Sequence, residues 1–175
     1  RSCSSVLWSL AKLGYKAEPE LLDKLVQRTV ESMEKGQNGS TKALGNLLWG
    51  LSRMGHRPPA QLLGRLEELF RNLLLRLSEE VSSDDVARTS QRSLTMTMGN
   101  ILVSLVKLGY QPSEDMVHLL RQVIMKFLPD FTDNTLVMVL WSISKVERSQ
   151  DPAFQQAMGE RFENRIGSLS KGTLA

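Results

Sequence analysis

The 175-residue sequence has only one cysteine, two histidines and no long run of apolar residues. Cys3 has no second cysteine to pair with, which argues against a secreted domain held together by disulfides. His56 and His118 lie in separate segments without the spacing of metal ligands, so we expect no metal site. No apolar stretch approaches the roughly 18 residues of a membrane-spanning helix, and we expect no membrane partner.

Catalytic motifs are missing as well. The sequence contains neither a glycine-rich phosphate loop nor a dinucleotide-binding fingerprint. Acidic pairs such as Glu67 and Glu68 are adjacent along the chain, which is typical of solvated charge and not of two carboxylates held across a cleft. We therefore expect no enzymatic activity, no cofactor and no small-molecule substrate.

Basic residues are in small excess. Lys and Arg number 22 against 19 Asp and Glu, which gives a net charge of +3 and an isoelectric point near 9.2. Such an excess does not by itself indicate nucleic-acid binding, so the placement of the charges matters more than their sum. A hydrophobic content of 41% is enough for a buried core in one domain or a short run of repeats.

Four nine-residue segments resemble one another: 7–15, 48–56, 102–110 and 140–148. Their first leucines are separated by 41, 54 and 38 residues, and removing a polar insertion at 78–93 reduces the long interval to 38. This spacing predicts an all-α fold, an α-solenoid of about four helical-hairpin repeats with a period near 38 residues. We place the repeats at about 1–38, 39–77, 94–131 and 132–170 of a single domain, and expect the chain to be a segment of a longer protein.

Each unit is expected to form two helices. The first helix contains the nine-residue segment and in three units ends at a glycine able to adopt the left-handed conformation, namely Gly14, Gly55 and Gly109. A proline-containing turn then leads into the second helix, because proline is well tolerated in a first helical turn. Ser40 and Thr132 are expected to cap the first helices of the second and fourth units.

A polar stripe follows the first helix of every unit. Counted from the first leucine of the segment, its positions are minus two, plus two and plus five, and offsets of four and three residues fall on one helix face. Unit by unit, the stripe comprises Ser5, Ser9 and Lys12; Asn46, Gly50 and Arg53; Asn100, Ser104 and Lys107; and Met138, Ser142 and Lys145. A basic residue fills plus five and a small residue fills plus two in every unit, which predicts a row of cations beside a row of small side chains.

Two interpretations of this stripe remain open. Basic residues near a helix C-terminus complement the helix dipole, and small residues permit close helix packing. In the interpretation that we favour, the cations neutralise a phosphate backbone, the small residues let it approach, and Asn46 and Asn100 bond base edges. Charge supports the second interpretation, because segments 1–16, 40–57, 94–111 and 132–148 sum to +7, whereas segments 17–34, 58–77, 112–126 and 149–170 sum to −3.

Two further sets of side chains could contact bases. Position plus eight, just beyond the first helix, holds Tyr15, His56, Tyr110 and Arg148. These could stack on an unpaired base or could plug the turn between the two helices. Position plus one holds Trp8, Trp49, Val103 and Trp141. We interpret this position as packing between repeats, with base stacking as the alternative.

The signature L-W-x-L-x-K-L-G-Y in a 38-residue hairpin followed by proline resembles the octotricopeptide repeat family of organelle proteins. The resemblance covers most of the chain, and the fourth unit departs from it with Val146 and Glu147 in place of Leu-Gly. It implies that the stripe binds single-stranded RNA inside an organelle, for which we favour the mitochondrion over the chloroplast. It also implies that the protein stabilises or organises a messenger or ribosomal RNA, including ribosomal RNA beside ribosomal proteins in a mitochondrial ribosome. A protein-binding scaffold of the HEAT or TPR type is the alternative.

Overall fold

The structure, a computed structural model, describes residues 3–36, 41–79, 85–146 and 151–166. These residues contain α-helices and one short 3-10 helix but no β-strand, so the predicted all-α class is confirmed for them. The helices are α1 (Cys3–Lys12), α2 (Pro19–Glu34), α3 (Thr41–Met54), α4 (Ala60–Glu79), α5 (Asp85–Lys107), α6 (Glu114–Phe127), η1 (Leu128–Asp130), α7 (Asp133–Val146) and α8 (Pro152–Ile166).

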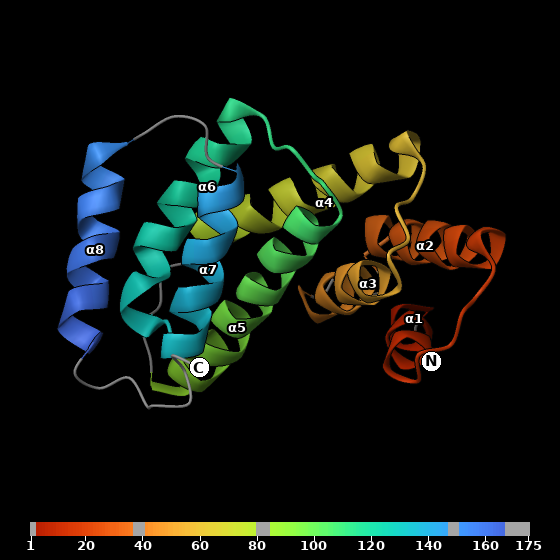
Figure 1. The fold of residues 1–175 in the computed structure, drawn as a ribbon, viewed down its shortest axis with the longest axis horizontal. Helices are drawn as coiled ribbons and strands as arrows, with labels where there is room; N and C mark the ends of the chain where they lie inside the picture. The colour runs from red at the N-terminus through yellow and green to blue at the C-terminus, as the bar shows by residue number, and fades with distance from the viewer. Residues whose placement is uncertain (1–2, 37–40, 80–84, 147–150, 167–175) are drawn as a thin grey trace.

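The helices form two layers. The odd-numbered helices pack in chain order, α1 on α3, α3 on α5 and α5 on α7, and the even-numbered helices make a second series from α2 to α8. In Figure 1, α1 and α2 lie at one end of the long axis and α8 lies at the other. We call the two series the odd layer and the even layer.

One continuous apolar core lies between the layers. In α4, for example, the buried residues Leu66, Phe70, Leu73, Leu74 and Leu77 recur at the three- and four-residue spacing that places side chains on one helix face. Equivalent faces of the other helices join them in a single buried cluster that runs from Leu7 to Met158. The layer contacts therefore depend on the apolar periodicity of each helix.

The predicted glycine ends are confirmed for three helices of the odd layer. Gly14, Gly55 and Gly109 have φ of +66°, +66° and +70°. In each case the glycine N–H donates a hydrogen bond to the carbonyl three residues earlier. The N–H of the following residue donates to the carbonyl five residues earlier, as from Tyr15 to Leu10 at 3.0 Å. This Schellman arrangement satisfies carbonyls that a helix end leaves unpaired.

We expect Gly55→Ala to lower the free energy of unfolding by about 1–2 kcal/mol, because an L-residue is strained in the left-handed region. A Cβ at Gly55 would meet no atom within 4 Å, so backbone strain is the whole cost. Gly64→Ala, within α4 and equally uncrowded, is the matched control and should stabilise the protein by up to about 1 kcal/mol. Urea unfolding of both variants measures the two effects; a stable Gly55→Ala variant would contradict the assignment.

The helix starts also follow their sequence signals. The Thr132 hydroxyl accepts a hydrogen bond from the Thr135 N–H at 3.2 Å, which confirms Thr132 as a cap of α7. Pro19 and Pro152 are the first residues of α2 and α8, as expected for the turns that precede the second helices. Ser40, the other expected cap, lies outside the described residues.

The insertion predicted at residues 78–93 is partly helical. Its first two residues complete α4, and α5 begins at Asp85, so residues 85–93 lengthen α5 to 23 residues. This stretch contains neither glycine nor proline, and an aspartate at its start suits a helix N-terminus. The polar character of the segment therefore does not interrupt the helix.

Candidate nucleic-acid interface

Glycines set the contacts between neighbouring helices of the odd layer. A Cβ at Gly50 of α3 would lie 3.2 Å from the Leu7 carbonyl oxygen of α1, and one at Gly45 would lie 2.8 Å from Thr97 of α5. Gly99 of α5 similarly faces α7, where a Cβ would lie 3.5 Å from Met138 and Thr135. Two flanks of α3 and of α5 thus contact other odd helices, and α1 and α7 each contact one. The apolar flank of each helix faces the even layer, which leaves an outer face.

The four basic residues at plus five all lie on this outer face. Lys12, Arg53, Lys107 and Lys145 are exposed, each near the C-terminal end of its odd helix. Within the described part of the chain, Arg53, Lys107 and Lys145 form no ion pair or hydrogen bond through their side chains, and the Lys12 ammonium lies 5.1 Å from the centre of the Trp8 ring. We call these four residues the basic ladder.

The small residues at plus two do not line this surface, which corrects the expectation of an open row beside the cations. Gly50, Ser104 and Ser142 are buried, and Ser9 alone is exposed. Gly50 sits against the α1 backbone, while Ser104 and Ser142 donate hydrogen bonds to carbonyls four residues earlier in their own helices. Position plus two lies 200° around the helix axis from the first leucine of the segment, on the flank toward the preceding odd helix. Close helix packing therefore explains why its side chains are small.

The residues at minus two occupy the edge of the outer face. Ser5 is exposed, whereas Asn46, Asn100 and Met138 are half-buried. Minus two lies within about 20° of plus five around the helix axis, so these side chains are neighbours of the ladder. The two asparagines are therefore placed where an amide could reach a ligand bound along it.

The tryptophans are more exposed than the sequence predicted. Trp8 and Trp141 retain 37% and 41% of their accessible surface, Trp49 is half-buried, and the Trp8 and Trp49 rings lie 6.0 Å apart at 37°. Packing between repeats therefore accounts for only part of each ring. Plus one precedes plus five by four residues, so each ring shares the outer face with a cation of the ladder. That four-residue spacing is the sequence signal that could have revealed their exposure.

The residues at plus eight differ among units. Tyr15 is 57% exposed and available to a ligand. His56 instead contacts α2, with its Nε2 2.7 Å from the Asp23 carboxylate, and is 13% exposed. Arg148 lies outside the described residues.

Tyr110 is enclosed at the equivalent turn of the third unit. Its hydroxyl is buried, and burial first, then the Glu67 carboxylate, raise the pKa of Tyr110. The His56 and Tyr110 side chains therefore plug the turns between their helices, and they are not placed to stack on a base.

A hollow of about 530 Å³ lies where α1 and α3 end. Lys12, Lys16 and Arg53 line it together with Tyr15, and none of the described residues that line it is acidic. Lys12 and Arg53 belong to successive units and line the same concavity, so these two cations of the basic ladder are neighbours in space. Lys16, which follows α1, was not among the residues expected at the interface.

Acidic residues are scarce throughout the odd layer. α1 and α3 contain none, and α5 and α7 contain one each, Asp85 and Asp133, both at the first helical residue. The ladder lies at the opposite ends of these helices. Its positive potential is therefore not offset by carboxylates of the same helices.

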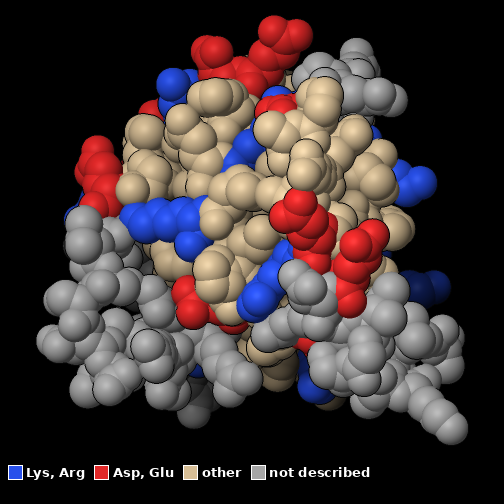
Figure 2. Space-filling model, turned by 90° about the vertical axis from the view of Figure 1, so that its left-hand side faces the viewer, with Lys and Arg blue, Asp and Glu red and all other residues tan. Residues whose placement is uncertain are grey.

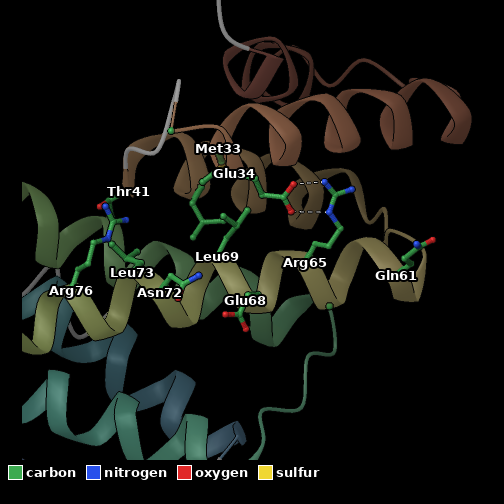
Figure 3. Close-up of a pocket in the computed structure, with 13 residues that line it drawn as sticks. Met33, Glu34, Thr41, Gln61, Arg65, Glu68, Leu69, Asn72, Leu73 and Arg76 are labelled. Atoms are coloured by element: carbon green, nitrogen blue, oxygen red, sulfur yellow. Dashed lines mark hydrogen bonds and ion pairs between the residues drawn. The ribbon is translucent and has the colours of Figure 1, made fainter.

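The even layer has mixed charge. A concavity of about 720 Å³ between α2, the start of α3 and α4 is lined by Glu34, Arg65, Glu68 and Arg76 together with apolar residues (Figure 3). Arg65 donates two hydrogen bonds to the Glu34 carboxylate, at 2.8 and 2.5 Å. Figure 2, viewed from the α8 end, likewise shows acidic and basic side chains interspersed among uncharged ones.

We expect the Glu34–Arg65 pair to make a small, pH-dependent contribution to stability. The hydrogen bonds from Arg65 lower the pKa of Glu34, so the contribution is complete above the usual glutamate pKa and is lost as the pH falls through the lowered value. Because both side chains are a third or more exposed, Glu34→Gln should cost only about 0.2–1 kcal/mol at pH 7. Urea unfolding of the parent protein and of Glu34→Gln at pH 7 and pH 3 tests this. The same difference in free energy of unfolding between the two proteins at both pH values would contradict it.

Comparison with protein-family models, with curated proteins and with solved structures gives no match. None of the described helices is both long and apolar enough to cross a membrane. Groups of three or more His, Cys, Asp or Glu side chains that could hold a metal ion do not occur among the described residues.

Proposed function

We propose that this protein binds single-stranded RNA on the outer face of its odd layer. The observation that carries the proposal is the basic ladder: four exposed cations at one equivalent helix position, on helices whose only carboxylates lie at the far ends. A polyanion laid across α1, α3, α5 and α7 would meet one cation from each. Neutralising successive phosphates in this way supplies affinity that does not depend on base sequence.

We further propose that the fold is a four-unit α-solenoid of the octotricopeptide type. The order of helix contacts within each layer and the recurrent glycine ends support this architecture. In helical solenoids each unit contacts only its neighbours, and one layer offers an extended binding surface. The proposed setting is an organelle, where the protein stabilises or organises a messenger RNA or a ribosomal RNA, including one within a mitochondrial ribosome.

A single strand suits this surface better than a duplex does. Exposed tryptophan rings and the half-buried Asn46 and Asn100 amides lie beside the cations. Bases of an unpaired strand can stack on rings and bond through their edges, whereas those of a duplex are already stacked and paired. The proposal therefore includes a preference for unpaired RNA.

A salt series with a fluorescent 12-nucleotide RNA tests the proposal. Four phosphate contacts to a single strand predict a log–log slope of about −2.8, or roughly 50-fold weaker binding at 200 mM than at 50 mM salt. A duplex of the same length and an acidic peptide serve as competitors. Absence of binding by the labelled RNA would contradict the proposal. Displacement of bound RNA more readily by the peptide than by the duplex would favour the alternative, a protein-binding scaffold of the HEAT or TPR type.

A further inference from the structure

We infer that Trp8, Trp49 and Trp141 are stacking platforms for the bases of the bound strand. This inference rests on the proposed function and assigns a binding role to rings that packing between repeats does not fully cover. The ladder alone would attract any polyanion, because ammonium and guanidinium groups recognise phosphate without reference to bases. The rings would add discrimination between a nucleic acid and another anionic chain.

The helical register pairs each ring with a cation. Trp8 precedes Lys12, Trp49 precedes Arg53 and Trp141 precedes Lys145 by four residues, about one helical turn. The Lys12 ammonium lies over the Trp8 ring, 5.1 Å from its centre, so a base that stacks on this face would take the place of the ammonium as it turns to a phosphate. A phosphate on the cation and its base on the ring would therefore come from the same or adjacent nucleotides.

Exposure distinguishes the rings from the leucines beside them in sequence. Leu7 and Leu48, which immediately precede Trp8 and Trp49, are fully buried, whereas Trp8 is 37% exposed. Trp141 is the most exposed of the three, at 41%. A ring needed only for packing would gain more by complete burial, since the hydrophobic contribution scales with the apolar area removed from water.

The third unit interrupts the series. Val103 occupies its plus-one position, beside Lys107, and is half-buried. This unit keeps the cation but lacks the ring. Three units would therefore stack a base and one would contact phosphate alone, which makes Val103 a site where a fourth platform could be installed.

Intrinsic fluorescence isolates these rings, because Trp8, Trp49 and Trp141 are the only tryptophans of the protein. We expect a 12-nucleotide oligoadenylate to quench the emission on binding. Inorganic polyphosphate, which offers negative charge but no bases, should bind the ladder with little quenching. Equal quenching by the two ligands would overturn the stacking role.

Substitutions at Trp141 separate stacking from packing. Both Trp141→Phe and Trp141→Leu keep an apolar side chain, but only phenylalanine presents a ring. Since removing one base–aromatic stack typically costs roughly 5- to 150-fold in affinity, the leucine variant should bind the labelled oligoadenylate weakly. The phenylalanine variant should stay close to the parent, and both should unfold at similar temperatures. Equal affinity of the two variants would overturn the inference.

Val103→Trp provides a gain of function that a misfolded protein cannot mimic. We expect it to tighten oligoadenylate binding by roughly 5-fold or more, while Val103→Leu leaves it unchanged. If RNA binds with the predicted salt dependence but no ring substitution matters, the stacking role fails and the proposed function stands. If no RNA binds at all, both fail.

Discussion

The variant in which Lys12, Arg53, Lys107 and Lys145 are all replaced by alanine should bind single-stranded RNA with almost no dependence on salt. Removing four phosphate contacts takes the expected log–log slope from about −2.8 toward zero and abolishes most of the affinity at 50 mM salt. These side chains are exposed and alanine is a strong helix former, so we expect the thermal unfolding midpoint to change little. Fluorescence anisotropy at four salt concentrations measures the slope.

The even layer offers a matched control for this variant. Lys24, Arg28, Arg71 and Arg76 are also exposed and lie on α2 and α4. Replacing these four with alanine changes the net charge from +3 to −1, as the ladder variant does. The slope should then remain near that of the parent protein. If both variants lost binding equally, net charge and not the ladder would hold the RNA.

The variant Gly50→Leu should separate α1 from α3 and lower the free energy of unfolding by about 1–3 kcal/mol. Even a Cβ at this position would lie 3.2 Å from the Leu7 carbonyl oxygen, and backbone cannot rotate away as a side chain can. The remaining leucine atoms would displace the whole of α1. Urea denaturation measures the loss, and faster amide hydrogen exchange in α1 would locate it.

Ser9 provides the control for Gly50, because it occupies the same plus-two position in the first unit. Its side chain is exposed and donates a hydrogen bond to the Ser5 carbonyl in its own helix. Ser9→Leu should therefore change stability by no more than about 0.5 kcal/mol. Equal losses in the two variants would mean that leucine is poorly tolerated at plus two for reasons other than helix contact.

Local features of the fold were predictable from the sequence because they depend on neighbouring residues. Gly14, Gly55 and Gly109 end their helices where the apolar pattern stops, and Thr132 caps α7. The exposure of the basic ladder was likewise predictable, since lysine and arginine rarely become fully buried without a partner.

Features that depend on the packing of one helix against another were not predictable. The four-residue spacing to Lys12 and Lys145 places Trp8 and Trp141 on the outer face, but how much of each ring a neighbouring helix covers depends on helix packing. The same packing buries Gly50 and leaves Ser9 exposed at equivalent positions. The pairing of His56, in the turn after α3, with Asp23 of α2 joins residues 33 apart in the chain, and no local signal reveals that these two segments meet.

The order of contacts along the odd layer has a consequence for cooperativity. α1 packs mainly on α2 and α3, and α7 mainly on α5 and α8, so the two ends are joined only through the units between them. In such a linear array, terminal units can fray while the centre stays folded. An RNA strand that binds all four cations would stabilise both terminal units at once, since a ligand that binds only the folded form stabilises that form. RNA binding should therefore slow amide hydrogen exchange most in α1 and α8, because the bound strand links the two ends of the array.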